Sequence, residues 1–133
     1  MVFQVPVYAN SVTVLYLERS DSTTLLYLPF LKRAVIDHPF SPFLNVSPQQ
    51  MNELSKAGIL FNFTWDELSP LLGVDPQIMY NTIRSVGPEH FTLSSDAGEP
   101  LFPDSVEALR LVRGYMEAFG LTQEELYTVA IPS

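Results

Sequence analysis

Three short apolar segments alternate with helix-like segments from residue 33 onward, and this alternation constrains the fold more than any other feature. The apolar segments are Arg33–Asp37, Ile59–Phe63 and Phe91–Ser94. Strands that are apolar along their whole length are typical of parallel sheets buried beneath helices. Strands separated by helices are typical of βαβ units, whose connections return each strand in the same direction. The sequence therefore predicts an α/β fold with parallel βα units.

Capping residues and glycines predict where the intervening helices begin and end. Each expected helix follows a Ser, Thr or Asp whose side chain can accept a hydrogen bond from the first turn. The expected helices are 48–57, 65–72, 76–86, 105–119 and 123–129. Two of them begin with a capping box, formed by Ser47 with Gln50 and by Thr122 with Glu125. Glycine follows the first four helices, where a left-handed residue commonly ends a helix.

The N-terminal segment fits two interpretations. Ser11–Leu17 has the β-branched and aromatic residues of a strand. Thr23–Lys32 is either a second strand completing a hairpin or a helix with Pro29 inside it; we favour the helix. Residues 1–32 are left unassigned, and 133 residues suffice for one domain spanning 1–133.

Composition excludes several classes of function. A hydrophobic content of 47% with 17% charged residues suits a folded protein despite a net charge of −8. The seven Lys and Arg residues are scattered, so nucleic acid is not expected as a ligand, although residues 64–84 have the outline of a helix-turn-helix. No segment resembles a signal peptide or a membrane span, so a soluble, cytoplasmic protein without a membrane partner is expected. Without cysteine, a metal site must use histidine and carboxylate ligands.

Two polar residues follow predicted strands at positions that build active sites in parallel α/β folds. His38 follows the first of the three strands, and Asp96 follows the last. Both are metal ligands in proteins, although an Asp after a strand also forms turns and a His before proline is often a loop residue. Pro39 is expected to hold His38 extended. His90, at the start of its strand, is expected to be structural.

The residues around Asp96 resemble those of the amidohydrolase superfamily of metal-dependent hydrolases. The sequence reads VGPEHFTLSSDAGEP from Val86 and PDSVEALRL from Pro103, similar to the last strand and helix of such a TIM barrel. The resemblance implies that Asp96 is a metal ligand and the catalytic general base. It also implies that His38, in a segment similar to the family's His-Pro strand, binds metal or substrate. It covers residues 33–131, and implies the C-terminal half of a (β/α)8 barrel.

The resemblance is incomplete, because such barrels have eight strands and this chain supplies three or four. The family's early His-x-His pair, its middle-strand Lys or Glu and its fifth-strand His have no counterpart, and two ligands are fewer than catalytic zinc needs. We therefore expect a hydrolase fragment or subunit whose divalent metal, zinc above all, requires completion of the site. The expected partners are a second copy or a complementary barrel half, and a small-molecule substrate. The alternatives are a non-enzymatic interaction or structural subunit and an unrelated small α/β protein.

Overall fold

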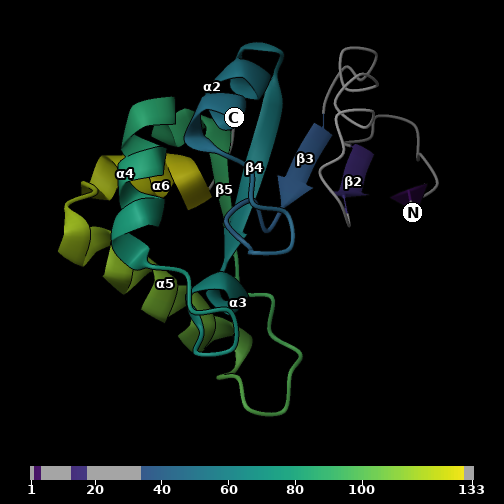
Figure 1. The fold of residues 1–133 in the computed structure, drawn as a ribbon. Helices are drawn as coiled ribbons and strands as arrows, with labels where there is room; N and C mark the ends of the chain where they lie inside the picture. The colour runs from purple at the N-terminus through teal and green to yellow at the C-terminus, as the bar shows by residue number, and fades with distance from the viewer. Residues whose placement is uncertain (1, 4–12, 18–33, 131–133) are drawn as a thin grey trace.

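The computed structural model describes residues 2–3, 13–17 and 34–130 (Figure 1). Its elements in chain order are β1 (Val2–Phe3), β2 (Thr13–Leu17), β3 (Ala34–Asp37), α2 (Pro48–Lys56), β4 (Ile59–Thr64), α3 (Trp65–Leu68), α4 (Pro76–Val86), the 3-10 helix η2 (Pro88–His90), β5 (Phe91–Ser94), α5 (Ser105–Phe119) and α6 (Gln123–Ala130). The predicted α/β class is confirmed. The segment 23–32, for which a helix was favoured over a strand, lies outside the described residues.

The strands form one sheet in which spatial order follows chain order. β2, β3, β4 and β5 are neighbours in sequence and are mutually parallel, while β1 pairs antiparallel with β2. Ile36, Phe61 and Phe91 share one row across β3, β4 and β5. The predicted parallel sheet is therefore present, and all its parallel strands end at the same edge, at the bottom of Figure 1.

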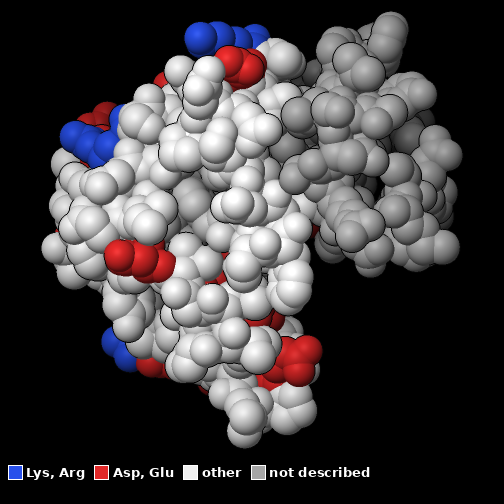
Figure 2. Space-filling view, viewed as in Figure 1, with Lys and Arg blue, Asp and Glu red and all other residues white. Residues whose placement is uncertain are grey.

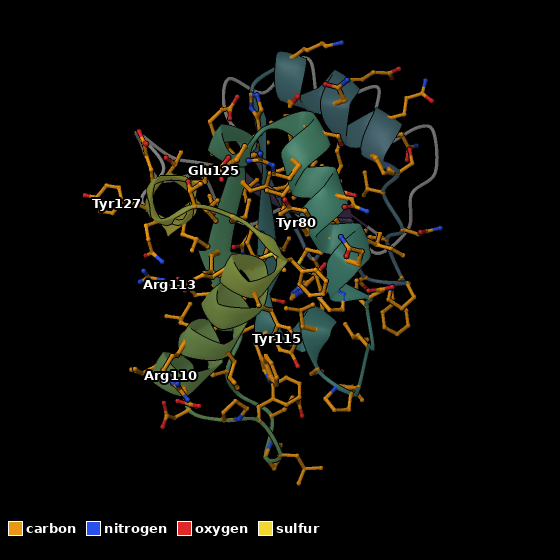
Figure 3. The ribbon with its side chains drawn as sticks, turned by 90° about the vertical axis from the view of Figure 1, so that its left-hand side faces the viewer. Tyr80, Arg110, Arg113, Tyr115, Glu125 and Tyr127 are labelled. Atoms are coloured by element: carbon orange, nitrogen blue, oxygen red, sulfur yellow. The ribbon has the colours of Figure 1, made fainter. Side chains whose placement is uncertain are left out.

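The long helices form a layer on one side of the sheet. Figure 1 shows α2, α4, α5 and α6 to the left of β3 and β4, and Figure 3 shows them in front of the strands when that side faces the viewer. Beneath them lies the core, whose fully buried side chains include Ile36, Ile59, Phe61, Phe63, Phe91, Met51, Met79, Ile83, Val112 and Met116. The strand members occupy alternate positions, because successive side chains of a strand point to opposite faces.

The opposite face of the sheet is partly exposed and more polar. Asn62 lies at its centre and donates through Nδ2 to Asp37 Oδ1 at 2.6 Å and to Ser94 Oγ at 2.8 Å. Thr92 Oγ1 donates to Asn62 Oδ1 at 3.0 Å. These bonds join three adjacent strands near their carboxyl ends, which makes that end of the sheet rigid and polar.

Local signals set most helix boundaries, with one error. Asp104 caps α5 through its bond from the Glu107 backbone N–H, and Gly120 ends α5 in the left-handed conformation. Helix α3, predicted to reach residue 72, ends at Leu68 because Ser69 is extended, as residues before a proline usually are. No helix in the described ranges is long and apolar enough to cross a membrane.

Candidate metal centre

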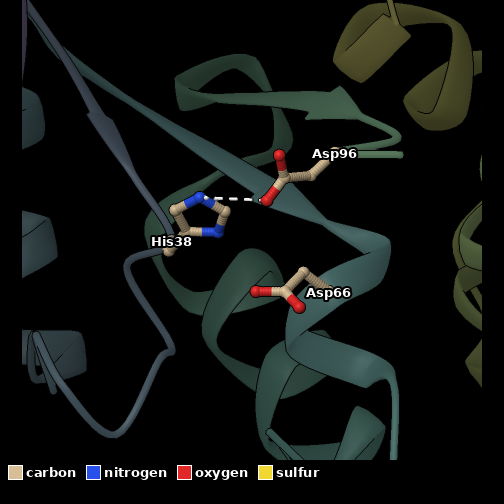
Figure 4. A group of neighbouring side chains, drawn as sticks. All are labelled: His38, Asp66 and Asp96. Carbon is tan, nitrogen blue, oxygen red and sulfur yellow. Dashed lines mark ion pairs between the residues drawn. The ribbon is translucent and has the colours of Figure 1, made fainter. Parts of the chain in front are cut away.

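Three polar side chains meet where the connections leave β3, β4 and β5. His38 directly follows β3, Asp66 lies in the first turn of α3 after β4, and Asp96 follows β5 by two residues. Because these strands are parallel and adjacent, their carboxyl ends bring the three residues together. One ligand atom from each residue lies within 4.8 Å of those of the other two (Figure 4).

Within this group, His38 and Asp96 form an ion-pair contact. Nε2 of His38 lies 3.3 Å from Oδ2 of Asp96, shown by the dashed line in Figure 4. A tetrahedral zinc ion about 2.1 Å from each ligand places two ligand atoms about 3.4 Å apart, so this distance suits a shared metal ion. It suits equally a direct hydrogen bond between imidazole and carboxylate. Asp66 adds a second carboxylate to the metal-free group, and it would add a third ligand to a metal-bound one.

The other ring nitrogen of His38 faces Thr64. Nδ1 lies 3.2 Å from the hydroxyl oxygen of Thr64, a side chain that is almost completely buried. If Nδ1 carries the proton and donates it to this oxygen, the lone pair of Nε2 points at the carboxylates. A hydrogen bond of this kind commonly orients a histidine that binds metal.

Both sequence-predicted site residues have left-handed backbone conformations, with φ of 53° at His38 and 46° at Asp96. The prediction that His38 is extended before Pro39 is therefore wrong. Tertiary hydrogen bonds override the local preference, because the His38 N–H donates to the Asn62 carbonyl at 3.0 Å and the His38 carbonyl accepts from Ser41 N–H at 3.0 Å. This conformation costs a non-glycine residue about 1–2 kcal/mol, and at His38 the two backbone hydrogen bonds offset that cost.

The buried carboxyl group of Glu67 connects two of the segments that form the site. Glu67 is fully buried; its Oε1 accepts from Phe40 N–H at 2.7 Å and its Oε2 accepts from Thr64 N–H at 3.0 Å. Burial raises the pKa of Glu67 to about 8, against the opposing effect of the bonds from Thr64, Phe40 and Ser41. Glu67 therefore ties the loop after His38 to the start of the helix that carries Asp66.

The electrostatics of Asp66 are those of a crowded carboxylate. Burial raises its pKa most, and the negative charge of Asp96 raises it further, followed by that of Glu99; His38 acts in the opposite direction. A cation placed between Asp66 and Asp96 would reverse the effect of their mutual repulsion.

The three residues line a pocket of about 600 Å³. Its other described lining residues are Asp37, Ser41, Phe43, Leu44, Leu71, Leu72, Gly98, Glu99 and Phe102. Figure 2 shows acidic side chains at the lower right of the described part of the molecule, with no basic side chain beside them on that visible face. The pocket combines an acidic part with an apolar wall.

The structure brings His38 and Asp96 together, as their positions after parallel strands predicted, and adds Asp66. Sequence reasoning missed Asp66 because the segment after Ile59–Phe63 was interpreted only as a capped helix start. The signal was present, since Asp66 follows a strand by two residues, as Asp96 does. His90 lies at the other end of β5, with Nε2 3.7 Å from Glu89 Oε1, outside the site.

Comparison of the chain with protein-family models, curated proteins and solved structures gives no match. The relationship to amidohydrolases therefore stays a prediction from the residues around Asp96. The functional argument below rests on the geometry of the site.

Proposed function

We propose that His38, Asp66 and Asp96 bind one divalent metal ion, zinc above all, and that the chain is an amidohydrolase-type hydrolase or a subunit of one. The observation that carries the proposal is the convergence of three ligand atoms within 4.8 Å in a pocket. Three protein ligands of nitrogen and oxygen type, with a further position left open, are the usual set of catalytic zinc. Asp66 supplies the third ligand that the sequence alone lacked.

A divalent ion bound there would supply an activated water molecule, since it lowers the pKa of that water towards neutrality. Asp96 would act as the general base, because its side chain is half exposed and has a second oxygen free to accept a proton. His38 would be held as a ligand through Nε2 by its contact with Thr64. The remaining pocket volume would receive the substrate.

The fold supports a half-barrel origin for this site. Sequential parallel strands with the long helices on one side are the arrangement found in a (β/α)8 barrel. The strands that a full barrel has in addition to these would then come from a second copy of this chain or from a complementary chain. A different observation favours a second candidate, a non-enzymatic interaction subunit. Val35 and Leu60 remain partly exposed on the sheet face opposite the helices, where a partner could cover them.

Zinc titration calorimetry on the full chain, after removal of bound metal with a chelator, tests the metal site. We expect one ion per chain, and binding weakened by at least about 10–100-fold for His38→Ala, Asp66→Asn and Asp96→Asn, since loss of even a group that only supports a ligand weakens binding by that factor. His90→Ala is the matched histidine control, and its affinity should equal that of the parent protein. Thermal unfolding with and without zinc provides a second readout, since an ion that binds the folded chain raises its stability.

The metal site is refuted when zinc fails to bind, or when His38→Ala and His90→Ala bind it equally well. Zinc binding without hydrolysis of any amide or ester, in both the single chain and its oligomers, would favour the interaction subunit. Mass photometry gives the oligomeric state for that comparison.

A further inference from the structure

Carboxylates dominate the polar lining of the pocket. The described lining residues include Asp37, Asp66, Asp96 and Glu99, and no lysine or arginine is among them. One carboxylate oxygen of Asp66 and one of Asp96 lie within 4.8 Å of each other and of a ring nitrogen of His38, so negative charge is concentrated in this part of the pocket. One divalent ion offsets two negative charges, which leaves the site acidic even when it is occupied. An anionic group would therefore enter against like charge.

The rest of the pocket is apolar. Phe43, Leu44, Leu71, Leu72 and Phe102 line it, and they come from the connections after β3, β4 and β5. Phe43 and Leu71 are 75% and 68% exposed, a large exposure for apolar side chains at the mouth of a cavity. A hydrophobic group of a ligand would cover them, with a gain for each carbon removed from water. The volume of about 600 Å³ is that of a small-molecule site.

We propose that the pocket binds small molecules that join a hydrophobic group to an uncharged or cationic polar group, and that it discriminates against anionic ones. The hydrophobic group lies against Phe43 and Leu71, and the polar group lies near Glu99 and the three ligand residues. This inference rests on the proposed function, because it names the substrate class of the same site. For a hydrolase it selects neutral amides or esters with an apolar substituent, and amines of the same shape as ligands.

Three probes of matched shape test the inference: phenylbutylamine, phenylbutanamide and phenylbutanoate. Their dissociation constants are measured by calorimetry on the metal-free full chain, so that no direct bond between a metal ion and a probe adds to the electrostatic effect of the pocket carboxylates. We expect the amine to bind at least about tenfold more tightly than the carboxylate, with the amide between them. Added salt should weaken the binding of the amine more than that of the other two probes.

Two variants with matched controls assign the effect to the pocket. Glu99→Gln should reduce the preference for amine over carboxylate by about threefold or more, whereas Glu124→Gln on exposed α6 should leave it unchanged. Phe43→Ser should lower the affinity for all three probes by about tenfold. Tyr127→Ser, which removes another exposed aromatic ring, should leave these affinities unchanged.

The outcomes separate this inference from the metal site. Equal or tighter binding of the carboxylate by the metal-free chain overturns the inference, as does failure of all three probes to bind, while zinc titration can still succeed. If the chain prefers the amine but does not bind zinc, the result supports this inference and refutes the proposed metal-dependent function. An amine preference unchanged in Glu99→Gln but reduced in Glu124→Gln also overturns the inference, because the charge then acts from outside the pocket.

Discussion

Replacement of Glu67 by glutamine should flatten the pH dependence of stability. The pKa of Glu67 rises from an ordinary 4.5 to about 8 in the folded chain, mainly through burial. The folded state therefore binds this proton more tightly than the unfolded state does. The resulting stabilisation is complete below pH 4.5 and is lost as the pH rises through 8. Glutamine has a similar shape and cannot ionise. Because its amide nitrogen cannot accept from a backbone N–H, it loses one of the two bonds that the carboxyl oxygens accept, a loss that does not change with pH.

The difference between 4.5 and about 8 corresponds to about 5 kcal/mol, as an upper value, because water entry and local relaxation reduce the cost of a buried charge. This is comparable with the whole stability of a small domain, about 5–15 kcal/mol. The stability of the parent chain relative to Glu67→Gln should therefore fall by up to about 4 kcal/mol between pH 5 and pH 9, because a small part is already lost at pH 5.

Urea unfolding at closely spaced pH values, followed by circular dichroism, measures this difference. Glu124→Gln removes an exposed carboxylate and should follow the parent curve throughout. Parallel curves for the parent and Glu67→Gln would refute the reasoning. A parent chain that gains stability relative to Glu67→Gln as the pH rises would show that the backbone N–H bonds outweigh burial and lower the pKa of Glu67.

Three further predictions concern the core, a helix end and the metal site. Phe61→Ala should lose about 3–5 kcal/mol in urea unfolding, because Phe61 is fully buried, whereas Leu101→Ala at a 95% exposed residue should change stability by less than about 0.5 kcal/mol. Gly120→Ala should lose about 1–2 kcal/mol, because Gly120 has φ of 118° and a Cβ there would lie 3.1 Å from the Tyr80 hydroxyl; an unchanged midpoint would contradict this. Zinc affinity should fall as the pH falls, since protons compete with the ion for its ligands, and the raised pKa of Asp66 lets this competition begin at a higher pH than for an ordinary aspartate; calorimetry giving the same pH dependence for the parent chain and Asp66→Asn would argue against Asp66 as a ligand.

Local signals in the sequence predicted most of the elements correctly. Ser47 with Gln50 begins α2, Asp104 begins α5 and Gly120 ends it, because each acts through hydrogen bonds or backbone freedom within a few residues. The shorter α3 shows where the local interpretation was incomplete, since Pro70 restricts Ser69 before the predicted end. The choice between helix and strand at 23–32 stays a prediction.

The candidate site was only partly predictable. His38 and Asp96 could be placed at one edge from the rule for parallel strands, but the rule says nothing of distances between side chains. Asp66 met the same rule and was overlooked, because a capped helix already explained its segment. The conformation of His38 could not be predicted from Pro39, since it depends on a bond to the Asn62 carbonyl in the neighbouring strand.

The sequence by itself determined the α/β class, the parallel strands and the edge where polar residues gather. These properties follow from hydrophobic patterns and capping contacts between residues close along the chain. Only the tertiary structure decided that Asp66 lies beside His38 and Asp96, that the neighbouring Glu67 is buried and that apolar residues line an acidic pocket. Those properties depend on the register of neighbouring strands and on packing between distant segments, which local interactions do not specify.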